Sequence, residues 1–216
     1  MKTPARKAIL KICGLTRRVD AEAALRHGAT HLGFVFYPGS PRALKPEQAL
    51  EIHKGLGGVK VGVFVNETPA GVLAAARVAR LDAVQLCGAE APGDFADFPY
   101  PIWRTLRDPG ALPESRDWPH AELFVLDLAA GDHYGGTGLA GDDGAAARFA
   151  ARHRAVLAGG LTPDNVARRI GRVLPAGADV SSGVESAPGI KDERKISAFL
   201  AAAIPALPRL QKKVTT

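Results

Sequence analysis

The stretch AVLAGGLTPDNVARRIGRVLPAGADVSSGVE, residues 155–185, contains one complete repeat of the pattern that decides the fold. A short apolar run, Ala155–Ala158, breaks at two glycines. An amphipathic stretch follows and leads to a second apolar run, Ala178–Ser181. Continuous apolar runs, rather than alternating ones, are typical of parallel strands that are covered on both faces. The stretch therefore predicts a strand, a helix and a second parallel strand.

The same pattern recurs along the whole chain. Eight strands that alternate with helices in about 200 residues favour a (β/α)8 TIM barrel. We predict one α/β domain over residues 1–216, with a core from about residue 8 to 205 and a short tail over 206–216. An open, doubly wound sheet is the alternative, but CGLTRRVD after the first run lacks the G-x-G-x-x-G turn usual there. The predicted strands are Ile9–Cys13, His31–Tyr37, Val59–Val65, Ala83–Leu86, Ile102–Leu106, Leu123–Leu128, Ala155–Ala158 and Ala178–Ser181.

Local signals mark where several of the helices begin and end. Thr68-Pro69 and Thr162-Pro163 each predict an N-cap followed by proline in the first turn. Gly28 is expected to cap the first helix at its carboxyl end. The predicted helical stretches cover residues 18–28, 45–57, 68–80, 142–154, 162–174 and 191–203.

Composition limits the possible compartments and partners. Apolar residues make up 46% of the chain and charged residues 23%, as in ordinary soluble globular proteins. Two cysteines cannot build a disulfide framework, so we expect a reducing, cytoplasmic location. We expect neither a membrane span nor a signal peptide. The net charge of +6 favours anionic partners, but the basic residues are scattered, so nucleic acid is not expected.

The ends of the last two predicted strands indicate a phosphate site. In TIM barrels the loops after the seventh and eighth strands often bind phosphate. Gly159 and Gly160 would let the backbone approach a ligand closely, and Ser181, Ser182 and Gly183 would supply N–H and hydroxyl donors. A helix after SSGVE would point its N-terminus at the anion. The alternative is that these residues only turn the chain.

Three further residues are candidates for chemistry. Asp127 follows the apolar run LFVL, where a carboxylate is costly unless it is paired or functional, although it could also cap the next loop. Arg42, in GSPRAL, is either a surface residue or a bidentate partner for a carboxylate ligand. Cys13 ends the first strand and is either a small buried hydrophobe or a reactive thiol.

Seven motifs together resemble the phosphoribosylanthranilate isomerase family. They are KICGLT, GFVFYPGSPR, VGVFVN, VQLCG, YGGTG, AGGLTPDNV and DVSSGVE with PGIKD, and they run in order from about residue 9 to residue 200. The resemblance implies a TIM barrel that uses no metal or other cofactor. It also implies an Amadori rearrangement in tryptophan biosynthesis, from N-(5-phosphoribosyl)anthranilate to 1-(2-carboxyphenylamino)-1-deoxyribulose 5-phosphate.

The resemblance also implies a role for each matching residue. Cys13 of KICG falls on the family's general base, and Asp127 falls on its general acid. Arg42 of SPR would face the carboxylate of the anthranilate group. The backbone of AGGL and SSG would hold the phosphate, and Asp179 would give polar support. Opening the ribose ring and moving one proton from C2′ needs only an acid and a base.

Two departures from the family pattern keep alternatives open. Cys87 stands where the family commonly has histidine, and the chain reads GLAGDD from Gly138 on, where an aromatic-rich segment is common. Another phosphosugar barrel, similar to indole-glycerol-phosphate synthase or ribulose-phosphate epimerase, is one alternative, but KICG argues against it. A phosphate-binding barrel that has lost activity is the other. The family contains monomers and dimers, so we expect a monomer or a homodimer.

Overall fold

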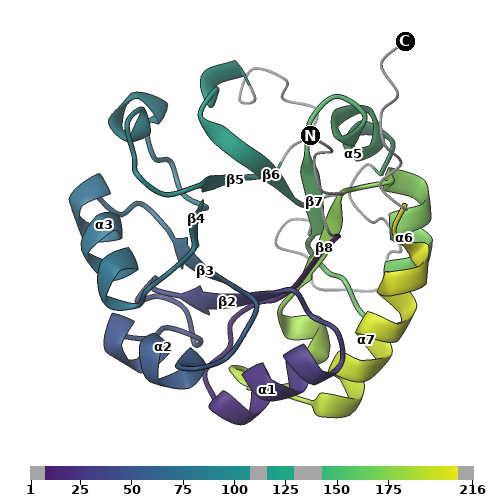
Figure 1. Cartoon of the computed structure of the whole chain (residues 1–216). Coiled ribbons are helices and arrows are strands. Elements are labelled where there is room, and N and C mark those ends of the chain that lie inside the picture. Colours follow the sequence, from purple (N-terminus) through teal and green to yellow (C-terminus); the bar gives the residue numbers. More distant parts are fainter. Residues whose placement is uncertain (1–7, 108–115, 129–142, 209–216) are drawn as a thin grey trace, which may run out of the picture.

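The computed structural model describes residues 8–107, 116–128 and 143–208, and its core is a closed barrel of eight parallel strands. The strands follow the chain order round the ring, and β8 pairs with β1 (Figure 1). The predicted TIM barrel is therefore confirmed. The strands are β1 (Ile9–Ile12), β2 (His31–Val35), β3 (Val59–Phe64), β4 (Ala83–Leu86), β5 (Ile102–Leu106), β6 (Ala121–Asp127), β7 (Ala155–Ala158) and β8 (Gly177–Val180).

The helices surround the barrel on its outside (Figure 1). Between β4 and β5 the chain forms only a short 3-10 helix, η1 (Pro92–Phe95). None of the helices in the described part of the chain is long and apolar enough to span a membrane. The α-helices are α1 (Arg18–Arg26), α2 (Pro46–His53), α3 (Pro69–Val78), α5 (Asp143–Ala150), α6 (Val166–Val173) and α7 (Glu193–Ala206).

One of the two Thr-Pro helix signals is confirmed and the other is wrong. Thr68 caps α3, because its hydroxyl accepts a hydrogen bond from the Gly71 N–H at 3.1 Å. The prediction for Thr162-Pro163 fails, because α6 begins only at Val166. The Asn165 side chain instead accepts from the Thr162 N–H at 2.9 Å and folds this segment into a turn.

Strand limits differ from the prediction mainly at the carboxyl ends. The second strand was predicted to reach Tyr37 but ends at Val35. Tyr37 begins a turn, in which its carbonyl accepts from the Ser40 N–H at 3.0 Å. The last strand ends at Val180, so Ser181 belongs to the loop that follows.

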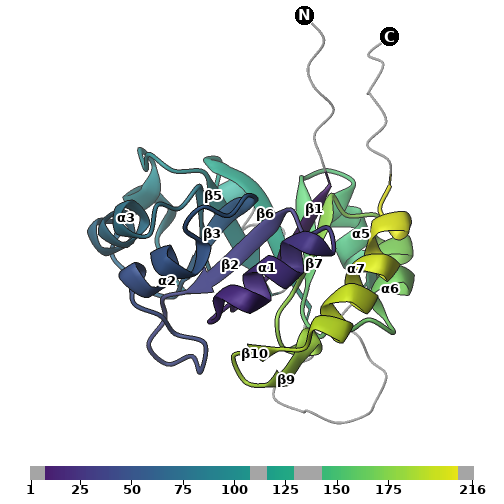
Figure 2. The same ribbon diagram turned by 60° about the horizontal axis from the view of Figure 1, so that its bottom comes forward.

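No α-helix follows SSGVE directly, and the next one, α7, begins only at Glu193. The structure has a three-residue 3-10 turn, η2 (Ser182–Val184), followed by the antiparallel hairpin of β9 (Glu185–Ala187) and β10 (Ile190–Lys191). The Glu185 carboxylate accepts a hydrogen bond from the Gly189 N–H at 3.3 Å and so helps to close the hairpin. Figure 2 shows this hairpin at one end of the barrel, next to the start of α7.

Side chains alternate between the inside of the barrel and the surrounding helices. On β1, Leu10 and Ile12 belong to the apolar core that includes the helices, whereas Ile9, Lys11 and Cys13 point inward. One layer of the barrel interior is apolar. Polar side chains lie between this layer and the carboxyl ends of the strands. The apolar layer consists of Ile9, Val61, Ala83, Trp103, Leu123, Val125, Val156 and Ala158.

Candidate active site

A cavity of about 300 Å³ lies at the carboxyl ends of the barrel strands. Eight of the nine residues predicted for the site line it, and Arg42 is not among the described residues that do so. Val63, Gln85 and Cys87 contribute to the wall as well. The eight predicted residues are Cys13, Asp127, Gly159, Gly160, Asp179, Ser181, Ser182 and Gly183.

The loop after β7 is held from behind by two side chains. Gly159 and Gly160 adopt φ of 78° and 61°, which glycine allows without strain. The Gly159 carbonyl accepts from Arg169 Nη1 at 2.9 Å, and the Gly160 carbonyl accepts from Asn165 Nδ2 at 2.9 Å. Because C=O and N–H point in opposite directions in a trans peptide, the N–H groups of Gly160 and Leu161 point away from these side chains.

The loop after β8 packs directly against the loop after β7. A Cβ atom at Gly183 would stand only 1.8 Å from the Leu161 carbonyl oxygen. Gly183 therefore does more than leave room for a ligand, because no side chain fits between the two loops. The backbone segments that line this end of the cavity are in direct contact.

A buried ion pair lies under the cavity. The Lys11 ammonium is fully buried and donates to Asp179 Oδ2 at 2.7 Å and to Gln85 Oε1 at 2.8 Å. Burial alone would lower the pKa of Lys11, but Asp179 and Cys13 together outweigh it and raise this pKa. Burial raises the pKa of Asp179, and Lys11 opposes that shift. Asp179 Oδ1 is buried without a hydrogen-bond partner in the described part of the chain.

The thiol of Cys13 lies just above this pair. The residue is buried, and its N–H donates to the Val180 carbonyl at 2.8 Å, which ties the end of β1 to β8. Burial raises the pKa of the Cys13 thiol, and the positive charge of Lys11 acts in the opposite direction. Cys13 packs with Val35 and Val63, which makes its other side apolar.

The second thiol has a different environment. Cys87 Sγ lies 3.0 Å from Thr105 Oγ1 and accepts from Gln85 Nε2 at 3.4 Å. Burial raises the pKa of Cys87 to about 11. Both cysteines are free thiols, so the cavity contains two thiols with different hydrogen-bonding partners.

Asp127 ends β6 and lines the cavity, half-buried, next to Ala158 of β7 in the strand register. The segment that follows it, GDHYGGTG, and most of GLAGDD lie outside the described residues. The strand order is β6, β7, β8, β1, so the two glycine- and serine-containing loops lie between Asp127 and Cys13 round the barrel.

Arg42 lies beside the cavity and is bound to a carboxylate of the protein. Its Nε and Nη2 donate to the two oxygens of Glu185 at 2.7 and 2.6 Å. Lys191 Nζ donates to Glu185 as well, at 2.8 Å, and to the Ser181 carbonyl at 3.1 Å. Burial alone would raise the pKa of Glu185, but the bonds from Arg42 and Lys191 lower it to about 2. The guanidinium therefore has an ionised partner at neutral pH.

Sequence reasoning missed Lys11, Glu185 and Lys191. A signal for Lys11 was available, because a lysine inside the apolar run ILKIC needs a buried partner. The partner itself, Asp179, is 168 positions away in the chain and is brought close only by the pairing of β1 with β8. Glu185 and Lys191 face each other only because of the unpredicted hairpin.

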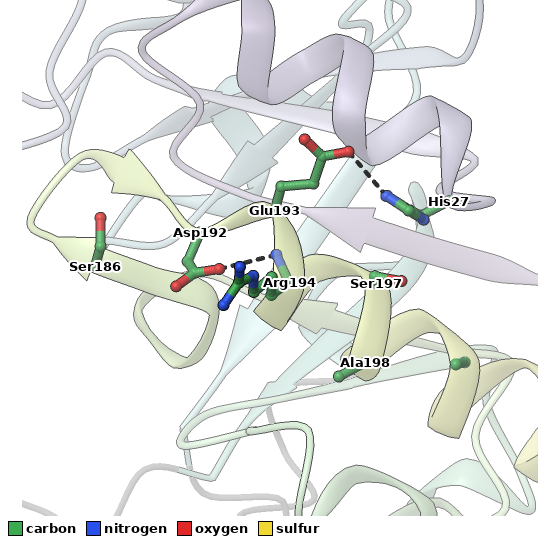
Figure 3. Close-up of a pocket in the computed structure, with 8 residues that line it drawn as sticks. His27, Ser186, Asp192, Glu193, Arg194, Ser197 and Ala198 are labelled. Carbon is green, nitrogen blue, oxygen red and sulfur yellow. Dashed lines mark hydrogen bonds and ion pairs between the residues drawn. The ribbon is translucent and has the colours of Figure 1, made fainter.

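A second hollow, of about 900 Å³, lies outside the barrel at the start of α7 (Figure 3). Its two acidic residues have structural partners. Asp192 caps α7 by accepting from the N–H groups of Arg194 and Lys195, and Glu193 accepts from His27 at 3.1 Å. None of the predicted site residues lines this hollow. The cavity in the barrel mouth is therefore the candidate active site.

Comparison with known proteins identifies the family. The family model for N-(5′-phosphoribosyl)anthranilate isomerase matches residues 10–202. The enzyme of that name from Solibacter usitatus is 46% identical over 200 residues, covering 92% of this chain and 98% of its own. The crystal structure of phosphoribosyl anthranilate isomerase from Thermotoga maritima has a TM-score of 0.84 and 36% identity, and the match covers 92% of this chain and 99% of that one.

A further crystal structure of phosphoribosyl anthranilate isomerase is a complex with reduced 1-(o-carboxyphenylamino)-1-deoxyribulose 5-phosphate. It has a TM-score of 0.81 and 34% identity, and the match covers 92% of this chain and 99% of that one. The fold, the ordered motifs and the relatives agree. The chain therefore belongs to the N-(5′-phosphoribosyl)anthranilate isomerase family, isomerases of tryptophan biosynthesis that interconvert an aldose and a ketose.

Proposed function

We propose that this protein rearranges N-(5-phosphoribosyl)anthranilate to 1-(2-carboxyphenylamino)-1-deoxyribulose 5-phosphate, with Cys13 as general base and Asp127 as general acid. One observation carries the proposal. The thiol and the carboxylate line the same cavity, and the loops after β7 and β8 lie between them in the strand order. A phosphate bound by these loops would hold the ribose between an acid on one side and a base on the other.

The proposed steps move protons only. Asp127 donates a proton to the ribose ring oxygen, the bond from C1′ to that oxygen breaks, and a protonated Schiff base forms. The Cys13 thiolate removes the proton from C2′, which gives an enolamine. Its 2′-hydroxyl then loses a proton while C1′ gains one, and the ketone results. Proton return from Cys13 to Asp127 through solvent restores the enzyme, so the steps need neither a metal nor a redox cofactor.

The phosphate contact is proposed for the backbone of the two loops. The Gly160 and Leu161 N–H groups, with the backbone and hydroxyls of Ser181 and Ser182, supply donors of the kind that phosphate oxygens accept. Arg169 and Asn165 fix the Gly159 and Gly160 carbonyls, so the loop needs little rearrangement to bind. Donors that are already oriented lose less entropy when the anion arrives.

The carboxylate contact is proposed for Arg42. Its aliphatic stem lies against Gly14, where a Cβ atom would stand within 3.0 Å of both Arg42 Cδ and Ser181 Oγ. The side chain thus borders the loop after β8. Because Glu185 already accepts two hydrogen bonds from the guanidinium, a substrate carboxylate would share Arg42 with Glu185 or replace it. A relative's complex with a reduced carboxyphenylamino sugar phosphate supports a ligand of this class.

The proposed base requires a reduced thiol. Both cysteines are free, which is compatible with the reducing, cytoplasmic location expected from the sequence. That location stays a prediction, and so does the choice between a monomer and a homodimer.

Turnover tests the proposed function directly. Purified protein is mixed with freshly generated N-(5-phosphoribosyl)anthranilate, and the anthranilate-linked fluorescence is followed. The proposal predicts a fall in fluorescence at a rate proportional to enzyme concentration. Binding of the substrate without turnover would contradict it and would favour the phosphate-binding barrel without activity.

A further inference from the structure

We propose that Lys11 is a positioning residue, whose buried ammonium supplies the counter-charge that lets Cys13 form a thiolate at the cavity. This inference deepens the proposed function and depends on Cys13 acting as the base. Lys11 touches no substrate in this account, because it is fully buried and is not among the cavity-lining residues. It acts through Cys13.

The geometry places the two side chains together. Cys13 directly follows β1 and is two positions after Lys11, so both point into the barrel, one layer above the other. Both fill the space that Gly33 leaves open on β2. A Cβ atom at Gly33 would stand 2.8 Å from Cys13 Sγ and 2.9 Å from Lys11 Cε. Glycine at this position is what allows the ammonium stem and the thiol to pack side by side.

The ammonium is held in a fixed orientation. Of its three N–H donors, one bonds to Asp179 Oδ2 at 2.7 Å and one to Gln85 Oε1 at 2.8 Å. From this position the positive charge of Lys11 lowers the pKa of the Cys13 thiol against the effect of burial. A buried ion pair contributes little net stability compared with apolar side chains of similar volume. Because the Lys11–Asp179 pair lies next to the Cys13 thiol, a role in function explains this pair better than a role in stability.

Other charged groups also act on Cys13. Asp179 on β8 raises the pKa of the thiol, and Lys191 on β10 lowers it. Cys87, just after β4, packs against the cluster that contains Cys13, and Asp127 on β6 acts on Asp179. Because Lys11 and Asp179 shift the pKa of Cys13 in opposite directions, removing each charge should have opposite effects. Loss of the Lys11 charge makes the thiol harder to ionise, and loss of the Asp179 charge makes it easier.

The test is the pH dependence of alkylation of Cys13 by iodoacetamide, with Cys13 and Cys87 separated by peptide mass spectrometry. In Lys11→Met the midpoint should rise by about 1–3 pH units, the usual effect of losing an opposite charge at close range. Lys11→Arg, which keeps the charge, should move it less. Asp179→Asn should move it down. The exposed lysine variant Lys54→Met is the matched control and should leave the profile unchanged.

Some variants need a safeguard against misfolding, because Lys11→Met leaves Asp179 buried without its partner. Far-UV circular dichroism checks each variant. If Lys11→Met does not fold, the double variant Lys11→Met/Asp179→Asn carries neither charge of this ion pair, and its midpoint should lie above that of Asp179→Asn alone. Equal midpoints in these two proteins, or an upward shift in Asp179→Asn, would overturn the proposal.

Kinetics separate this proposal from the proposed function. Lys11→Met should lower kcat at neutral pH and recover part of it at higher pH, whereas a purely structural role would lower kcat at every pH. If alkylation shifts as expected but Cys13→Ser keeps normal kcat, the assignment of the base fails while the electrostatic effect stands. If Cys13→Ser is inactive but alkylation does not shift, the role of Lys11 fails alone.

Discussion

The two sides of the barrel interior that meet at Cys13 differ in character. The charged side, formed by Lys11 on β1 and Asp179 on β8, carries an ion pair linked to Gln85. The apolar side, formed by Val35 on β2 and Val63 on β3, packs against the thiol and offers it no polar group. Both sides belong to parallel strands of one barrel, yet only one of them can stabilise a charge.

The two sides have opposite effects on the pKa of the Cys13 thiol. The apolar side buries Cys13, and burial raises the pKa of its thiol. The charged side lowers the same pKa through Lys11. A thiolate that forms against burial is poorly solvated, and a poorly solvated base with a nearby counter-charge is well suited to take a proton from carbon. The following predictions test this division, from the largest effect to the smallest.

The largest effect is expected for the acid. Asp127→Asn keeps the shape of the side chain at the end of β6 but removes the proton that opens the ribose ring. We expect kcat to fall by about 10²–10⁴, the usual contribution of a general acid. Steady-state kinetics give the change, and a thermal melt shows whether the fold is intact. A kcat close to that of the parent protein, in a variant with an unchanged melting temperature, would show that another group is the acid.

The two loop glycines should respond differently to substitution. Gly160 has φ of 61° with open space around its Cβ position, so Gly160→Ala should cost about 1–2 kcal/mol of stability from left-handed backbone strain and should raise KM. Gly183→Ala should cost more stability, because its Cβ would collide with the Leu161 carbonyl. Chemical denaturation measures both. Equal stability losses would mean that the contact between the loops is not tight.

Arg42→Ala should mainly weaken substrate binding. The loss of a charge-assisted bond to the substrate carboxylate corresponds to about 1.5–3 kcal/mol, which is roughly a 10- to 150-fold weaker affinity. A substrate analogue without the carboxylate should bind the variant and the parent equally well. Equal losses for both compounds, measured by calorimetry, would remove Arg42 from the carboxylate contact and leave it as the structural partner of Glu185.

The smallest effect on kcat is expected for substitution of Cys87. Cys87 lines the cavity next to Thr105, at a position where the sequence motif led us to expect histidine. Cys87→His should have a kcat equal to or slightly above that of the parent, because neither proposed proton transfer uses this side chain. A large loss of kcat, with the fold retained, would give Cys87 a role that the present account does not include.

The sequence predicted most of the fold because the repeat is local. The apolar runs at Ala83–Leu86, Ile102–Leu106 and Ala155–Ala158 match strands residue for residue. Predictions failed where a single hydrogen bond from a side chain decides the local structure. The turn before α6 is held by Asn165, and the hairpin that replaces the expected helix after SSGVE is closed by Glu185. Neither bond follows from helix or strand preference.

The candidate site also has features that the sequence predicted and features that it did not. Motifs located the loops and strand ends that line the cavity. The electrostatic environment of Cys13 was not predictable, because Lys11 meets Asp179 only after β1 pairs with β8 to close the barrel. The bidentate bond between Arg42 and Glu185 joins residues 143 positions apart and was missed for the same reason.

The kcat values of Cys13→Ser and Cys87→Ser test the central claim most directly. Both substitutions replace a thiol in the same cavity with a hydroxyl of similar size, and Cys13 is the thiol that packs with the Lys11 stem against Gly33. The account predicts that Cys13→Ser lowers kcat by about 10²–10⁴ with little loss of stability, because a hydroxyl does not ionise near neutral pH. Cys87→Ser should lose far less. A Cys13→Ser enzyme with near-normal kcat, beside an inactive Cys87→Ser enzyme, would contradict the account.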